Sequence, residues 1–360
     1  MIGKRLVRGT GSARWLAVGG AVACLVTGAF AAGLHFAGDG RAAHTPALRP
    51  GPEPSAPAVD WTAFPAYRNA VPVLLYHSVG GKPSYLTTPV KLFAAQMRAL
   101  WHGGFHAITM QQYVAYVHGR SRELPSRPIL LTFDDGRRDA YFAATPILAQ
   151  YGFHATEFDI PGWIRAYPGF ALPRADLVSM NDGRVWNVQL HFGYGKHTVA
   201  ISRTGAMGSV FGYLRYLPAT HGKHGRKGHL ESFAHFSRRF RANMRFGMRK
   251  FATIFHEKPI ADAIPASNYG QDTTNDPRIP KYVLPWLDRH FRAVFGGDYL
   301  DQGRNRPDQI PGRFSPKLSY RISMGPRETL PVFHCRLVSF VRSTPIPAER
   351  RCFRLLTTAK

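Results

Sequence analysis

The chain has 360 residues, of which 44% are hydrophobic, so it can bury a sizeable core and wholesale disorder is excluded. Lys and Arg number 47 against 22 Asp and Glu, and the formal net charge of +25 bears on partners rather than on fold. Anionic lipid headgroups, an acidic wall polymer, nucleic acid and a generally basic surface are all compatible with that charge. No basic run is long enough for a dedicated nucleic-acid arm, so no specific nucleic acid is expected.

The N-terminal region divides into three segments by composition. Residues 1–14 contain basic side chains and no acidic one, which predicts a cytoplasmic tail. Residues 15–38 contain no Asp, Glu, Lys or Arg, and a spanning helix needs about 20 apolar residues. We therefore expect a single-pass anchor in the cell membrane, or an uncleaved signal, with everything after it outside the cytoplasm. Cleavage near Ala31 and Ala32 is the alternative, and it would give a secreted protein.

Residues 39–66 are rich in Pro and Ala and predict a stiff, extended linker. The catalytic domain is expected over residues 67–360. Within it, short apolar runs alternate with segments of helical spacing, which indicates parallel strands joined by crossover helices. Strands are predicted at 71–76, 129–133, 155–160 and 185–190, and helices at 92–101, 140–150 and 229–256. The last helix is basic and aromatic; a core-facing aromatic stripe with a solvated basic face is favoured over a nucleic-acid-binding helix.

Two adjacent carboxylates, Asp134 and Asp135, follow the predicted strand at 129–133 and precede Gly136. In α/β barrels the catalytic groups sit at the carboxyl ends of strands. Two neighbouring carboxylates repel each other, and a bound cation relieves the repulsion if one ligates it while the other stays free as a base. A simple strand-end turn is the alternative, because Asp-Asp-Gly is also good turn chemistry.

Three histidines are candidates to act with these carboxylates. His191 ends the predicted strand at 185–190, and a Gly-rich turn brings back His197. Two imidazoles and one carboxylate form a three-ligand site that suits metal-assisted hydrolysis. His77 follows the first predicted strand, on the same face as Asp134, and a histidine there is suited to protonate a leaving amine. A surface or capping histidine is the alternative for His77.

Four motifs in this order resemble the polysaccharide deacetylases of carbohydrate esterase family 4: VPVLLYHSV, LLTFDDG, QLHFGYGKH and PASNYGQ. Within that family the chain is similar to the branch containing the poly-β-1,6-N-acetylglucosamine deacetylases, and the resemblance covers residues 71–318. It implies an α/β fold, an incomplete (β/α) barrel, and the uncharged run at 15–38 predicts one transmembrane helix before that barrel. It also implies a divalent metal, usually Zn²⁺, and hydrolysis of N-acetyl groups on a polymer of N-acetylglucosamine (GlcNAc).

The resemblance also implies a role for each matching residue. Asp134 matches the general base and His77 the general acid, while Asp135, His191 and His197 match the metal ligands. Lys196 reads as an inserted residue, since most of the family spaces its two histidines more closely.

The third motif departs further from the family, which usually has Pro-Tyr-Gly with an oxyanion donor from the Tyr backbone. Here the matching stretch centres on Ala266, whose N–H can still donate, and Asn268 and Tyr269 are candidates to shape the pocket. No Arg partner for the base is evident in this motif, and Arg313 is a candidate to orient an active-site carboxylate.

The expected function is therefore a metal-dependent hydrolase acting on an N-acetylated envelope or extracellular polysaccharide. The altered third motif keeps an alternative open, a catalytically weak relative that binds cell-wall glycan. The three cysteines include no CxxC pair, so thiolate zinc sites are unsupported. Cys335 and Cys352 are expected to pair if the C-terminal region is extracytoplasmic, and to remain two thiols otherwise.

Overall fold

The computed structural model describes residues 59–61, 64, 67, 71–120, 124–220, 227–271, 273–297, 318–341, 352 and 354. The predicted tail, the predicted anchor, most of the linker and Arg313 lie outside this part of the chain. No helix within the described ranges is both long and apolar enough to cross a bilayer. The chain divides into two units, 1–46 and 47–360, and every described residue belongs to the second.

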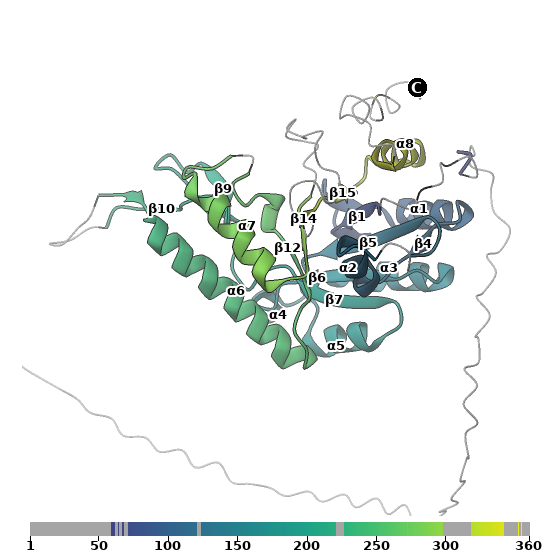
Figure 1. Ribbon diagram of the computed structural model, residues 1–360, viewed down its shortest axis with the longest axis horizontal. Helices are drawn as coiled ribbons and strands as arrows, with labels where there is room; N and C mark the ends of the chain where they lie inside the picture. Colours follow the sequence, from purple (N-terminus) through teal and green to yellow (C-terminus); the bar gives the residue numbers. More distant parts are fainter. Residues whose placement is uncertain are drawn as a thin grey trace, which may run out of the picture. The chain divides into compact units, whose positions relative to one another are not determined.

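A curved sheet of parallel strands forms the centre of this unit (Figure 1). Across the sheet the strands are β14 (Leu318–Ser319), β13 (Ala293–Phe295), β12 (Ala261–Ala263), β7 (Trp186–Leu190), β6 (Ala155–Asp159), β5 (Pro128–Asp134), β1 (Val73–Tyr76) and β15 (Ile322–Ser323), with β4 (His106–Ala107) paired to β5. The four predicted strands correspond to β1, β5, β6 and β7, with ends that differ by one or two residues. The predicted class, a parallel α/β sheet, is confirmed.

The two edges of the sheet are formed by almost consecutive segments. β14 pairs with β13 at one edge and β15 pairs with β1 at the other, yet only Tyr320 and Arg321 separate β14 from β15. Three Cα–Cα steps span at most about 11 Å, so the edges lie close together and the sheet is strongly curved. The fold is therefore an incomplete barrel, and one short segment of chain crosses its gap.

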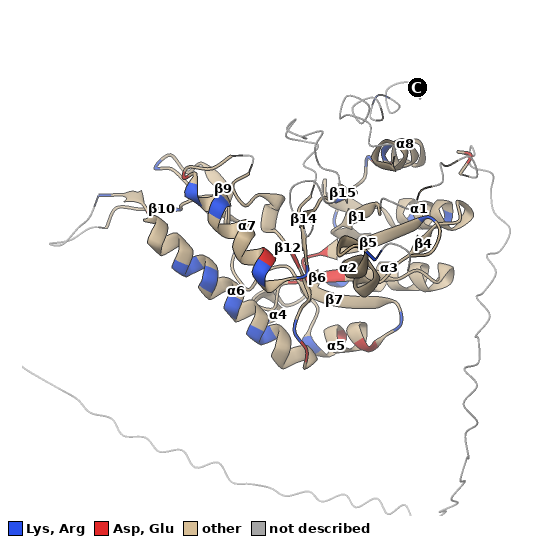
Figure 2. Ribbon diagram, in the orientation of Figure 1, with Lys and Arg blue, Asp and Glu red and all other residues tan. Residues whose placement is uncertain are grey.

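Helices pack against the sheet (Figure 1). They are α1 (Val90–His102), α2 (Met110–Val117), α3 (Arg138–Tyr151), α4 (Trp163–Ala166), α5 (Arg174–Asp182), α6 (Phe233–Phe255), α7 (Arg278–His290) and α8 (Leu330–Val341). The helix expected over 229–256 is α6, which begins after its N-cap Ser232. Phe236, Phe240 and Phe251 on α6 are buried, and Figure 2 shows Lys and Arg along the same helix. The expected division of this helix into an aromatic and a basic side is present.

Three short two-stranded sheets complete the described secondary structure: β2 (Ser78–Val79) with β3 (Thr87–Thr88), β8 (Thr198–Ala200) with β9 (Met207–Ser209), and β10 (Tyr216–Leu217) with β11 (His229–Leu230). The β8–β9 pair is an antiparallel hairpin that starts directly after His197. It therefore lies beside one of the candidate metal ligands.

The core reaches past Tyr67, the residue at which the sequence places the domain start. Trp61 and Phe64 are 6% and 2% exposed. Both rings contact Phe105, and Trp61 also contacts Phe333 of α8. The aromatic residues at the end of the predicted linker therefore belong to the packed domain, because their burial outweighs the extended tendency of the preceding Pro-rich chain.

Cys335 of α8 and Cys352 form a disulfide, with Cα atoms 5.5 Å apart. This separation is the usual one for a disulfide. Of the two expected states of these cysteines, the structure has the paired one.

Candidate active site

The carboxylate pair stands at the end of β5. β5 ends at Asp134, and Asp135 adopts a left-handed conformation with φ of 84°, which Asp tolerates better than most residues. Gly136 follows with φ of 61°, and a Cβ at this position would lie 2.2 Å from Oδ1 of Asp159. Its N–H donates to Oε1 of Glu157 at 2.8 Å. Both backbone and space therefore require glycine here, and the tight turn holds two consecutive carboxylates at the strand end.

Asp134 is held by a buried arginine. Nη1 and Nη2 of Arg321 donate to Oδ1 and Oδ2 of Asp134 at 2.6 and 2.8 Å. Burial acts to raise the pKa of Asp134, but the charge of Arg321 leads the interactions that oppose burial, and the pKa falls below its ordinary value. Asp134 is therefore ionised at neutral pH, with lone pairs left to accept a proton.

Arg321 comes from the segment that crosses the gap of the barrel, between β14 and β15. Its side chain is 1% exposed, and its Nε donates to the carbonyl oxygen of Gly296 at 3.0 Å. Sequence reasoning missed this residue and named Arg313 as the candidate to orient a carboxylate. The spacing of Arg321 from the DDG motif gives no signal, since only the fold brings the two together.

His191 follows β7 with its ring oriented by the backbone of β12. Its Nδ1 lies 2.7 Å from the carbonyl oxygen of Ala263, and a carbonyl can only accept, so Nδ1 carries the proton. Burial lowers the pKa of His191 to about 4, so the ring is neutral at pH 7. Nε2 therefore presents a lone pair, and it lies 3.7 Å from Oδ1 of Asp135. A lone pair facing a carboxylate calls for a cation between them.

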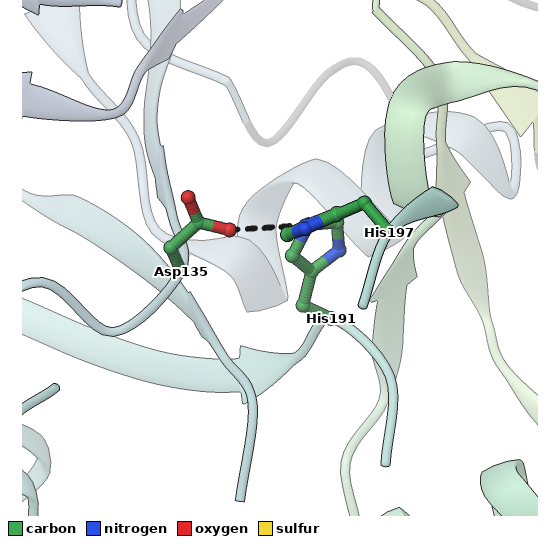
Figure 3. A group of neighbouring side chains, drawn as sticks. All are labelled: Asp135, His191 and His197. Carbon is green, nitrogen blue, oxygen red and sulfur yellow. Dashed lines mark hydrogen bonds and ion pairs between the residues drawn. The ribbon is translucent and has the colours of Figure 1, made fainter. Parts of the chain in front are cut away.

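His197 completes the group (Figure 3). Its Nε2 lies 3.1 Å from Oδ1 of Asp135 and 3.2 Å from Nε2 of His191. Although burial acts to raise the pKa of Asp135, the hydrogen bond and charge of His197 lower it below its ordinary value. Ligand atoms about 2.0–2.2 Å from a tetrahedral ion lie roughly 3.3 Å apart. The three separations of 3.1, 3.2 and 3.7 Å fit that spacing, so these residues suit a metal ion.

The loop between the two histidines is fixed from two sides. Asn243 of α6 accepts from the N–H of Gly193 and donates to the carbonyl oxygen of Tyr194, at 2.7 and 2.6 Å. Trp163 of α4 donates from Nε1 to the carbonyl oxygen of Gly195 at 2.8 Å, and its ring stands edge-on to His197. These contacts place His197 despite its unusual distance in sequence from His191.

His77 directly follows β1 and is half-buried. Burial lowers its pKa, while the charges of Asp135 and Asp134 act in the opposite direction. His77 therefore lies within electrostatic range of both carboxylates, at the same strand ends. The sequence expectation that it shares a face with Asp134 agrees with this position.

The altered third motif forms a tight turn, η2 (Pro265–Ser267), after β12. Ala266 is left-handed, with φ of 50°. The side chain of Asn268 accepts from the N–H of Gly270 at 2.6 Å, and Tyr269 is 7% exposed and packs in the core. Tyr269 and the side chain of Asn268 thus hold this segment in place, while Ala266 and Asn268 are both half-buried after β12.

Part of this chain is similar in sequence to known proteins. Residues 121–191 match the family described as Polysaccharide deacetylase, a stretch that includes Asp134, Asp135 and His191. Over 90 residues the chain is 36% identical to the Bacillus subtilis (strain 168) protein named "Putative polysaccharide deacetylase YxkH". That alignment covers 25% of this chain and about a third (32%) of the relative's length. The stretch that carries the DDG motif and His191 is therefore similar to polysaccharide deacetylases.

Solved structures match over more of the chain. A de-N-acetylase from Aggregatibacter actinomycetemcomitans has a TM-score of 0.55 and 18% identity, covering 70% of this chain and 94% of that one. IcaB from Ammonifex degensii has a TM-score of 0.53 and 22% identity, and the match covers 76% of this chain and 97% of that one. The BpsB deacetylase domain from Bordetella bronchiseptica has a TM-score of 0.53 and 20% identity, and the match covers 72% of this chain and 97% of that one. The chain thus shares the fold of these structures, a curled parallel half-barrel, which agrees with the incomplete barrel expected from the sequence.

Proposed function

We propose that this protein is a metal-dependent hydrolase that removes N-acetyl groups from a GlcNAc-containing envelope or extracellular polysaccharide. One observation carries the proposal. A group suited to a metal, formed by the buried Asp135 and His191 with the partly exposed His197, lies beside Asp134. Asp134 is an ionised carboxylate that a buried arginine holds in place. One acid is thus available to a cation while its neighbour remains a base.

Asp135, His191 and His197 would hold the metal, and zinc suits two imidazoles and one carboxylate. When bound, the ion supplies Lewis acidity and lowers the pKa of water. Asp134 takes a proton from the attacking water, and Arg321 keeps the carboxylate aimed at it. The water oxygen adds to the acetamide carbonyl, the C–N bond then breaks, and acetate and an amine leave.

Two further residues serve the charges that develop in this reaction. Hydrogen bonds occupy the N–H groups of Ser267, Tyr269 and Gly270, which leaves the N–H of Ala266 as the oxyanion donor of the turn. His77 donates the proton that the departing amine needs. Burial lowers the pKa of His77, and the charges of Asp135 and Asp134 act in the opposite direction, toward the protonated form that this role requires.

Acetate release tests the proposal. The protein is incubated with a panel of N-acetylated glycans, with and without a chelator, and then with added Zn²⁺. We expect release from at least one polymer, loss of release on chelation and recovery with metal. Asp134→Asn is the matched control, since it should keep the metal and lose turnover. Release that persists after complete metal removal would contradict the proposal.

A glycan-binding protein of low activity is the second candidate, and the altered third motif supports it. Ala266 stands where the family usually has Tyr, so the ring that stacks on substrate is missing. This candidate predicts zinc and glycan binding by the wild type without acetate release. The same assay, combined with glycan binding by calorimetry, distinguishes the two functions.

We further propose that the domain acts outside the cytoplasmic membrane, tethered by residues 15–38. The uncharged run there and the disulfide between Cys335 and Cys352 support this, because disulfides persist in oxidising compartments. Fractionation of cells with external protease tests it. Membrane-bound protein that resists salt extraction and is cleaved from outside is expected, and a soluble secreted form starting after residue 32 would show cleavage instead.

A further inference from the structure

The β8–β9 hairpin is tied at both ends to the candidate metal ligand His197. β8 starts at the next residue, Thr198. After β9, the N–H of Val210 donates to the carbonyl oxygen of His197 at 2.7 Å. The backbone of the hairpin therefore fixes where His197 stands.

The same hairpin also reaches the turn that contains Ala266. Ser209 pairs with Thr198 in the hairpin and is 6% exposed. Its hydroxyl lies 2.6 Å from the carbonyl oxygen of Asn268 and 3.3 Å from that of Pro265. Carbonyl oxygens only accept, so Ser209 is the donor, and its two acceptors flank Ala266 on either side.

That turn needs such support because its backbone is strained. Ala266 and Ser267 both have φ of 50°, a left-handed conformation that residues with a Cβ seldom adopt. Consecutive residues of this kind persist only where their surroundings hold them. Nε2 of Gln271 donates one stabilising hydrogen bond, to the carbonyl oxygen of Ser267 at 2.7 Å. The hydroxyl of Ser209 donates to the turn from the β8–β9 hairpin.

We propose that Ser209 is a positioning residue, whose hydroxyl sets the N–H of Ala266 relative to the metal ligand His197. This inference rests on the proposed deacetylase function. It joins the two departures of the sequence from the family, the wide histidine spacing and the altered third motif. The β8–β9 hairpin follows His197, and its Ser209 holds the Ala266 turn, which lacks the family's usual Pro-Tyr-Gly.

Removing the hydroxyl should affect turnover and spare the metal. In Ser209→Ala the carbonyl oxygen of Asn268 loses the Ser209 donor, and that of Pro265 keeps only the 3.5 Å bond from the N–H of Asn268. The backbone bond from Val210 still fixes His197. Loss of a whole oxyanion donor costs about 10²–10³-fold in kcat, so a displaced donor should cost roughly 10-fold. KM and metal content should stay within about twofold, because neither depends on a contact made only in the transition state.

Two matched variants isolate the hydroxyl. Ser209→Thr keeps it at a strand position where a β-branched residue is well accepted, so kcat should stay near that of the wild type. Ser202→Ala removes a hydroxyl from the other end of the same hairpin, where it contacts only Thr204 and the N–H of Ala206. It should leave kcat and KM unchanged.

The experiment measures kcat and KM for acetate release from GlcNAc oligomers by the full-length protein, with metal content by elemental analysis. A fall in kcat for Ser209→Ala alone, with metal retained, is expected. Wild-type kcat in that variant, or equal losses of metal and kcat, would overturn the inference. If Ser209→Ala does not fold, Ser209→Cys replaces it, since a thiol is only a weak donor, and full kcat in Ser209→Cys would overturn the inference. An inactive wild type would refute the proposed function, and the inference with it.

Discussion

Arg321 binds both carboxylate oxygens of Asp134, although 187 residues separate them in the sequence. The arginine belongs to the segment that crosses the gap between the two edges of the barrel, and the aspartate ends β5 near the middle of the sheet. Closing the barrel therefore also orients the proposed base. The same segment of chain therefore crosses the gap of the barrel and positions Asp134.

Arg321→Gln should retain metal but lose turnover. Asp134 would lose both the fork of donors that aims it and the charge that lowers its pKa. A misplacement of about 1 Å costs on the order of 10²-fold. The unpaired buried carboxylate should also lower the free energy of unfolding by about 3–5 kcal/mol. Acetate release, metal content and urea unfolding measure the three effects.

The matched control is Arg138→Gln, which breaks a 3.7 Å ion pair with Asp176 in which the two side chains are 39% and 32% exposed. Exposed pairs contribute little, so this variant should resemble the wild type in all three measurements. A fully active Arg321→Gln variant would show that Asp134 needs no orientation.

Asp134→Asn and Asp135→Asn should fail in different ways. The first keeps the shape and removes the proton acceptor, so metal remains while turnover falls about 10²–10⁴-fold. The second replaces an anionic ligand by a neutral one, so metal affinity falls and turnover with it, and His191→Ala should behave likewise. If the DDG motif were only a turn, both Asn variants would keep metal and near-normal release, since Asn serves almost as well in turns.

His77→Ala should keep the metal and lose turnover by about 10²–10⁴-fold, because the departing amine has no proton donor. Added imidazole should restore part of the rate if the missing group is an acid rather than a packing element. His102→Ala, an exposed histidine at the end of α1, is the control. Loss of metal from His77→Ala would instead make His77 a structural support of the metal site.

Asp159→Asn should stabilise the metal-free protein more at pH 8 than at pH 5. Both carboxylate oxygens of Asp159 are buried without a hydrogen-bond partner in the described part of the chain, and burial raises its pKa to about 7. A raised folded-state pKa gives a contribution to stability that is present below the unfolded pKa of about 3.9 and lost as pH rises through 7. The gain over wild type should be about 2 kcal/mol larger at pH 8.

Denaturant unfolding of both proteins at the two pH values measures this difference. The control is Asp182→Asn, the same substitution at an exposed position on α5. An equal effect of Asp159→Asn at pH 5 and pH 8 would contradict the raised pKa.

Reduction of the disulfide should loosen α8 and lower stability. Cys335 and Cys352 are 17 residues apart, and a loop of that length corresponds to about 3 kcal/mol in the chain-entropy model. Intact-mass measurement after alkylation without reductant should find neither thiol modified. The double variant Cys335→Ser with Cys352→Ser should have a free energy of unfolding lower by about 3 kcal/mol. Alkylation of both cysteines in the native protein would exclude the disulfide.

The sequence by itself determined four strands of the sheet, β1, β5, β6 and β7, and the functional residues at the ends of three of them. Asp134, Asp135, His191 and His77 each follow an apolar run that is a strand in the structure. Parallel strands place their carboxyl ends at one edge of the sheet, so position in the chain was enough to predict that these side chains meet. Burial and alternation are local properties, and for that reason the sequence displays them.

Only the tertiary structure decided how that group is held. The hydrogen bonds that Arg321 donates to Asp134, Ser209 to the Ala266 turn and Asn243 to the histidine loop all join segments far apart in the chain. Glu157 and Asp159 on β6 are equally inconspicuous in sequence, and their burial behind the DDG turn emerges only from packing. A hydrogen bond between distant segments leaves no periodicity and no fixed spacing, because its partners are chosen by how the sheet curves and closes.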